Sequence, residues 1–176
     1  TDDRTGLRAN AAKEVRRALL EDALVAPGTP IIAACSGGVD SVALVHLLAM
    51  ASDAYPLVHV LFIDHQLRDA TNERRSARAA AGAVGCPFTA LTVNVDERGN
   101  RQENASLARY EALGRFARPL NALVATGHTA SDQAETILQR LLRRSGLLGL
   151  TGIWPRRGRF IRPLLTMSRD SLDALK

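Results

Sequence analysis

IIAACSGGVDS, residues 31–41, is the stretch of sequence that decides the fold. The apolar run over residues 31–35 predicts a short buried strand, and apolar residues at helical spacing over 39–51 predict a helix after it. The two glycines between them, Gly37 and Gly38, let backbone N–H groups curl around an anion without a Cβ clash. Because the helix directs its positive N-terminus at the same point, this turn predicts a phosphate site.

The other side chains of this loop extend the phosphate-site hypothesis. Ser36 and Ser41 supply hydroxyl donors, and Val39 lies with them in the predicted binding loop. Asp40 places a carboxylate beside the phosphate, which is repulsive unless a cation such as Mg²⁺ bridges them. The loop has neither the Gly-Lys-Ser/Thr of the Walker pattern nor the Gly-x-Gly-x-x-Gly of the dinucleotide pattern. The structural alternative is an ordinary Gly-rich turn with a Ser/Asp cap.

Strand and helix patterns alternate along the rest of the chain. Helices are predicted over residues 9–24, 69–84, 103–118 and 131–144, and strands over 57–63, 88–95 and 122–126. Strands alternating with helices of about ten or more residues predict a parallel sheet covered on both faces. We therefore expect one doubly wound α/β domain over residues 1–176. Function should lie in the loops after its strands, at residues 36–41, 64–68, 96–101 and 127–132.

Near the end of the chain, an apolar piece over residues 160–165 precedes a helical pattern over 167–176. We expect the chain to be a fragment of a longer protein.

Composition excludes several classes of protein. No apolar run approaches the ~18 residues of a membrane span, and no signal peptide is visible, so we expect a cytoplasmic protein without a membrane partner. The two cysteines, Cys35 and Cys86, form no redox or zinc motif and are expected to be reduced. The net charge is +5, and residues 136–169 hold eight arginines and no acid. This basic tract predicts contact with a polyanion, or else a solvated helix face.

Ser-Gly-Gly-Val-Asp-Ser, residues 36–41, resembles the signature of the PP-loop ATP pyrophosphatases. The resemblance implies ATP and Mg²⁺ as cofactors. It also implies that a substrate oxygen attacks the α-phosphate, giving an adenylate, while the loop holds the departing pyrophosphate.

Three further stretches resemble one branch of this superfamily, the tRNA(Ile)-lysidine synthetases. They are IDHQLR at residues 63–68, the Gly-Asn and Arg-Tyr pairs within 99–110, and GHTASDQAET at 127–136. A run over residues 141–165, which ends in Arg-Pro-Leu-Leu, is similar to the same enzymes. The sequence departs from the family pattern at Ser106, Ser131 and Arg144, where the family has Arg, Asp and Gly.

The resemblance implies a role for each matching residue. Asp64 and His65 would lie beside the loop, where a nucleoside rests. The implied catalytic residues are Asp40, Arg109, His128 and Asp132. Arg109 would contact the triphosphate, His128 would polarise the reacting group, and Asp132 would join Asp40 as a ligand of Mg²⁺.

Each of these residues also has a structural alternative. The stretch after residue 63 also fits a helix-entry turn capped by Asp69 or Thr71. Arg109 also fits a solvated helix arginine, and Asp132 also fits a carboxylate favoured by the dipole of its own helix.

The resemblance finally implies a carbon–nitrogen ligase that releases AMP and pyrophosphate. Its partners would be tRNA(Ile), whose wobble cytidine is adenylated, and free lysine, which then forms lysidine; a homodimer is also allowed for. The alternatives are another tRNA-modifying PP-loop enzyme, one that performs 2-thiolation, and a non-catalytic ATP-binding module. We expect these residues alone to bind ATP and Mg²⁺ but to turn over tRNA poorly.

Overall fold

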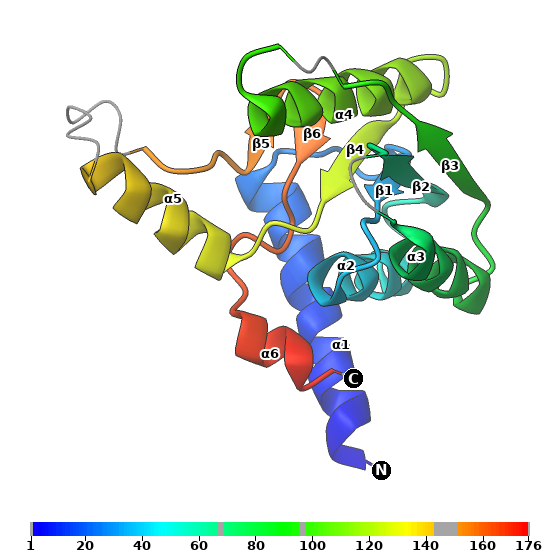
Figure 1. Cartoon of the computed structure of the whole chain (residues 1–176). Coiled ribbons are helices and arrows are strands. Elements are labelled where there is room, and N and C mark those ends of the chain that lie inside the picture. The colour runs from blue at the N-terminus through cyan, green and yellow to red at the C-terminus, as the bar shows by residue number, and fades with distance from the viewer. Residues whose placement is uncertain (1, 67–68, 96–97, 143–150, 176) are drawn as a thin grey trace.

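A six-stranded sheet forms the centre of the computed structural model, which describes residues 2–66, 69–95, 98–142 and 151–175 (Figure 1). Its strands are β1 (Ile31–Ala34), β2 (Leu57–Asp64), β3 (Phe88–Thr92), β4 (Leu123–Thr126), β5 (Arg156–Arg157) and β6 (Phe160–Ile161). They lie in the order β3-β2-β1-β4-β6-β5, and every pairing is parallel except that of β5 with β6. The predicted doubly wound parallel sheet is confirmed, with two short strands at one edge, β6 and the antiparallel β5, that were not predicted.

The predicted helices are present, with shifted ends. They are α1 (Asp2–Arg17), η1 (Ala18–Asp22), α2 (Val39–Met50), α3 (Thr71–Ala83), α4 (Arg101–Ala117), α5 (Ala130–Leu142) and α6 (Arg169–Asp173). The first predicted helix begins earlier than expected and ends in a π-helical turn, η1. The last is short and begins after Ser168, whose hydroxyl accepts a hydrogen bond from the backbone N–H of Ser171.

Alternate residues of β1 enter two different cores. Ile31 and Ala33 belong to a large apolar cluster with residues of α1, α2, α3 and α6, while Ile32 packs on the other face with Leu113 and Ala117 of α4. Figure 1 shows α2 and α3 on the side of the sheet opposite to α4. Since β1 is covered on both faces, its sequence is a continuous apolar run rather than an alternating one.

The strand order reverses between β1 and β4. From β1 the chain continues to β2 and β3 on one side, and β4 pairs with β1 on the other side. The loops that leave β1 and β4 therefore diverge, and a crevice opens at the carboxyl ends of these strands, where ligands bind in open α/β sheets.

Helix α5 follows β4 but does not cover the sheet. It extends away from the rest of the fold (Figure 1), and none of its described residues is buried. Across the described part of the chain, no helix has the length and apolar character needed to cross a membrane.

Candidate functional site

The loop between β1 and α2 packs closely against α3. Gly37 has φ +80°, and a Cβ at this position would lie 2.6 Å from the carbonyl carbon of Glu73 and closer still to its oxygen. The hydroxyl of Ser76 donates a hydrogen bond of 3.0 Å to the carbonyl oxygen of Gly37. The conformation of the loop therefore depends on glycine at this position and on its contact with α3.

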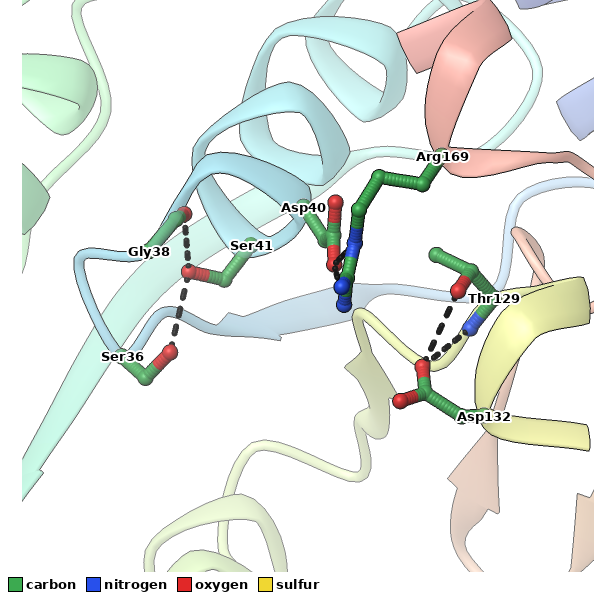
Figure 2. A network of polar contacts seen from close by, with 7 residues as sticks. All are labelled: Ser36, Gly38, Asp40, Ser41, Thr129, Asp132 and Arg169. Atoms are coloured by element: carbon green, nitrogen blue, oxygen red, sulfur yellow. Dashed lines mark hydrogen bonds and ion pairs between the residues drawn. The ribbon is translucent and has the colours of Figure 1, made fainter. Parts of the chain in front are cut away.

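The serines of the loop bond to the loop itself. The hydroxyl of Ser41 donates to the carbonyl oxygen of Gly38 at 2.8 Å and lies 3.2 Å from the hydroxyl of Ser36 (Figure 2). Because the proton of Ser41 goes to Gly38, Ser36 is the donor in the contact between the two hydroxyls. Gly38 is the N-cap of α2, and no described side chain caps it. The backbone N–H groups at the start of α2 are thus donors available to an anion, while the predicted roles of the hydroxyls of Ser36 and Ser41 stay predictions.

A cavity of about 420 Å³ lies beside the loop and collects most of the predicted site residues. Its polar lining includes Ser36, Ser41, Asp64, His65, Arg109 and His128. These residues come from the carboxyl ends of β1, β2 and β4 or the loops after them, from the first turn of α2 and from α4, as the strand-end rule predicts for all but Arg109. Leu61 and Ile63, on the face of β2 that α4 covers, contribute an apolar wall. A cavity of this size with one apolar wall suits a small planar ligand such as a nucleoside.

Gly127 lets the loop after β4 approach the start of α2. A Cβ at Gly127 would lie 3.1 Å from the backbone nitrogen and Cα of Ser41. This contact brings the two loops of the crevice together.

The other predicted residues lie around this cavity rather than among its described lining. Gly37 and Val39 line a second cavity of about 620 Å³ on another side of the loop, together with apolar residues of α2 and α6. Asp40 and Asp132 lie on opposite sides of the space next to the loop (Figure 2).

Asp40 forms an ion pair that was not predicted. Its Oδ2 accepts hydrogen bonds from Nη2 of Arg169 at 3.0 Å and from Nε at 3.3 Å (Figure 2). Its Oδ1 is buried and has no hydrogen-bond partner among the described residues. The sequence contained one signal for Arg169, because an arginine in the first turn of a helix opposes the helix dipole and so suggests another role.

Asp132 caps its own helix. Its Oδ2 accepts hydrogen bonds from the backbone N–H of Thr129 at 2.7 Å and from the hydroxyl of Thr129 at 3.1 Å. This is the reciprocal contact of a capping box, so one of the two carboxylate oxygens of Asp132 stabilises the start of its own helix. The hydrogen bond and the charge of Asp40 raise the pKa of Arg169, and the charge of Asp132 adds to this effect.

Asp64 and His65 combine a structural role with a place in the cavity. Asp64 accepts a hydrogen bond from the backbone N–H of Gln66 at 2.8 Å, and Asp69 accepts one from the N–H of Thr71 at 2.9 Å, so the predicted turn at the entry to α3 is present. Burial lowers the pKa of His65, and the charge of Arg109 lowers it further. Arg109 therefore lies close to His65 inside the cavity, although it also stacks on Tyr110, with 5.2 Å between the guanidinium carbon and the ring centroid.

His128 is held as a neutral imidazole. Its Nδ1 lies 2.9 Å from the hydroxyl of Thr126. Burial, followed by the positive charges of Arg162 and Arg109, lowers the pKa of His128 from 6.5 to about 4, and the charge of Asp132 opposes this shift. Thr126 and Arg162 were not predicted as site residues; both act on His128.

The lowered pKa of His128 predicts how stability depends on pH. In the folded chain His128 resists protonation. Its contribution to the free energy of unfolding is therefore fully present above pH 6.5, the pKa of the residue in the unfolded chain, and is lost as the pH falls toward about 4. When the pH falls from about 7.5 to about 5, the free energy of unfolding should decrease in the wild-type chain. In His128→Gln this decrease should be smaller by roughly 2 kcal/mol. Urea unfolding at the two pH values measures this difference, and equal losses would contradict the assigned pKa.

Most described arginines of the basic tract hold the fold together. Arg156 donates to the carbonyl oxygens of Ala23 and Leu24, and Arg159 donates to that of Ala122. Internal partners are also present for Arg140, Arg162 and Arg169. Arg143 and Arg144 lie outside the described residues. These described arginines thus have structural roles, and contact of the tract with a polyanion stays a prediction.

Comparison with known proteins agrees with this geometry. A family model described as a PP-loop domain matches residues 7–176. The chain is 40% identical over 172 residues to the tRNA(Ile)-lysidine synthase of Symbiobacterium thermophilum, covering 91% of this chain and 36% of the relative. It is 39% identical over 171 residues to that of Salinispora tropica, covering 92% of this chain and 50% of the relative. The chain thus spans between about a third and a half of the length of these curated relatives.

Solved structures show the same fold at low sequence identity. The U34-tRNA thiolase NcsA from Methanococcus maripaludis superposes with a TM-score of 0.80 at 19% identity, covering 98% of this chain and 63% of the other. The NH3-dependent NAD synthetase from Campylobacter jejuni gives a TM-score of 0.59 at 14% identity, covering 98% of this chain and 71% of the other. With the family model matching nearly the whole chain, and with the strand, glycine loop and helix in place, this chain belongs to the PP-loop domain family.

Proposed function

We propose that this chain is the ATP-binding catalytic part of an enzyme that adenylates the wobble cytidine of tRNA(Ile) and then joins lysine to it, forming lysidine. The observation that carries the proposal is the cavity that adjoins the loop. It gathers Asp64, His65, Arg109 and His128 beside the exposed N-terminus of α2. The names of the relatives, tRNA(Ile)-lysidine synthase, point to the substrate.

In this proposal the two parts of the site bind two parts of ATP. The backbone N–H groups at the start of α2 bind the phosphates, aided by the helix dipole. The apolar side chains of Leu61 and Ile63, which share one face of β2, pack against the base or ribose. Arg109 reaches the cavity from α4 with a positive charge for the phosphate groups.

The carboxylates next to the loop fit a magnesium ion. Mg²⁺ is usually held by one or two carboxylates together with substrate phosphates, and Asp40 has a buried oxygen without a described partner. The described residues contain no group of three or more His, Cys, Asp or Glu side chains that could hold a metal by themselves. Asp40 and Asp132 would hold the ion, which when bound would neutralise phosphate charge.

The chemistry requires charge stabilisation and a dry site. Attack of the cytidine O2 on the α-phosphorus breaks the bond to pyrophosphate, and the lysine amine then displaces AMP at C2. His128, which is neutral and half-buried, can donate or accept one hydrogen bond without adding charge, while Arg109 stabilises negative charge that develops on the α-phosphate.

The experiment is to measure pyrophosphate release from ATP with Mg²⁺. tRNA(Ile) with a cytidine wobble base is compared with other tRNAs, with and without lysine. Because the chain spans only part of the length of its relatives, the same assay is run on the full-length protein. Release that depends on this tRNA, with lysine incorporated into the RNA, supports the proposal. ATP binding without release from either protein would favour the non-catalytic module.

The thiolation alternative makes a separate prediction. Sulfur transfer needs a reactive thiolate, but burial raises the pKa of both Cys35 and Cys86, and neither is in a disulfide. We expect Cys35→Ser and Cys86→Ser to keep lysine incorporation into tRNA(Ile) within about threefold of the wild-type rate. Loss of activity in either variant, with tRNA and ATP binding intact, would instead favour thiolation.

A further inference from the structure

The guanidinium of Arg169 occupies the space between the two carboxylates of the site. Figure 2 shows it next to Asp40 and on the side that faces Asp132. It donates two hydrogen bonds to Oδ2 of Asp40 and leaves Oδ1 without a described partner. The site thus contains a cation of its own at the position where the proposed function requires Mg²⁺.

The backbone of Arg169 is anchored to the crevice. Arg169 follows the cap residue Ser168, and Met167 accepts a hydrogen bond from the backbone N–H of Ala130 at the start of α5. The side chain itself is 56% exposed, whereas that of Asp40 is 17% exposed. A long, exposed side chain on a fixed backbone can leave its partner at low cost, while the less exposed Asp40 stays in place.

The negative charges of Asp40 and Asp132 suggest a role for the positive charge of Arg169. Asp40 and Asp132 place two negative charges next to a proposed binding site for phosphates. Arg169 neutralises one of them, and as a guanidinium it is charged at every physiological pH. An unpaired Asp40 would repel the phosphates of ATP whenever Mg²⁺ is scarce.

We propose that Arg169 holds Asp40 until Mg²⁺ displaces it, so that this arginine sets the Mg²⁺ concentration at which the site binds metal and nucleotide together. The inference rests on the proposed binding of ATP and Mg²⁺ at the loop. Arg169 is in this view a positioning residue, because it acts through Asp40.

Two opposite effects are expected from Arg169→Gln. Without Mg²⁺, ATP should bind about three- to tenfold more weakly than to the wild-type chain, because Asp40 is then uncompensated. The Mg²⁺ concentration that gives half-maximal ATP binding should fall by about three- to tenfold, because the metal no longer competes with the guanidinium. At saturating Mg²⁺ the two effects offset, and the Kd for ATP should stay within about threefold of wild type.

The experiment is equilibrium binding of labelled ATP in the absence of tRNA, in EDTA and across a Mg²⁺ titration. Arg115→Gln is the matched control, because Arg115 forms an exposed ion pair with Glu111 on α4. Arg169→Lys keeps the charge with fewer donors, and its half-maximal Mg²⁺ concentration should lie between those of the wild-type chain and Arg169→Gln. Circular dichroism checks that each variant is folded; if Arg169→Gln is not, the lysine variant decides.

Each outcome bears on one of the two proposals. A half-maximal Mg²⁺ concentration that is unchanged or higher in Arg169→Gln, with Mg²⁺-dependent ATP binding by the wild-type chain, overturns the role of Arg169 alone. Failure of the wild-type chain to bind ATP overturns the proposed function, and this inference with it.

Discussion

Replacing Gly37 by alanine is expected to abolish ATP binding, with at least about a 100-fold increase in Kd. The reason is steric. The Cβ of alanine would lie 2.7 Å from the Cα of Glu73, which is a backbone atom of α3. A helix backbone cannot move aside as the end of a flexible side chain can. The loop must then move, and the N–H groups at the start of α2 lose their common direction. The strained φ of +80° adds about 1–2 kcal/mol of cost.

Gly28→Ala is the matched control for this prediction. Gly28 has φ +83°, nearly the same as Gly37, but no described atom lies within 4 Å of a Cβ built on it. The control should lose about 1–2 kcal/mol of stability and keep its affinity for ATP. Calorimetric titration with Mg²⁺ and ATP measures both variants. Normal ATP binding by a folded Gly37→Ala chain would show that the loop is not the phosphate site.

Asp40→Asn is expected to slow pyrophosphate release by at least about 100-fold at a fixed Mg²⁺ concentration. Asparagine has nearly the same shape but cannot supply the negative charge that the proposed metal needs. The free energy of unfolding should change little, by about 0–1 kcal/mol, because the side chain of Arg169 in the ion pair is 56% exposed.

Asp53→Asn provides the corresponding control for charge. Asp53 forms an ion pair with Arg16 of α1 and is 68% exposed, so the same substitution removes a carboxylate outside the site. Its rate of pyrophosphate release should equal that of the wild-type chain. Equal rates for Asp40→Asn and Asp53→Asn, measured with full-length protein and tRNA, would remove Asp40 from the proposed mechanism.

The strand–loop–helix around residues 31–41 was predictable because several signals coincide there. Ile31 and Ile32 are both apolar since β1 has a helix layer on each face, and the glycines that follow end the strand. The strand-end rule then placed Asp64, His65 and His128 in the loops that meet at one crevice, and the cavity confirms that they meet. The position of Arg109 came from the family resemblance, since one arginine on an amphipathic helix carries no local signal.

Other features had no local signal to predict them. Strands β5 and β6 are two residues long, too short for a periodic pattern, so the edge of the sheet was missed. A helix was predicted over residues 131–144, but not that Leu138, Leu141 and Leu142 of α5 stay exposed. The use of the basic tract could not be read from charge, because a guanidinium that bonds to carbonyl oxygens looks the same in sequence as one that meets phosphate. Lysine as a substrate, a homodimer and a cytoplasmic location stay predictions.

The ion pair between Asp40 and Arg169 also has a consequence for the time at which the site is completed during synthesis. The two residues are 129 positions apart in the chain. At about 5–20 residues per second, a ribosome makes the second of them roughly 6–26 s after the first. During that interval the nascent chain contains the glycine loop and Asp40 but not yet the residue that neutralises Asp40. Under the proposed function, a nucleotide that meets the chain in this interval would depend on Mg²⁺ to offset the charge of Asp40, whereas later Arg169 supplies that charge.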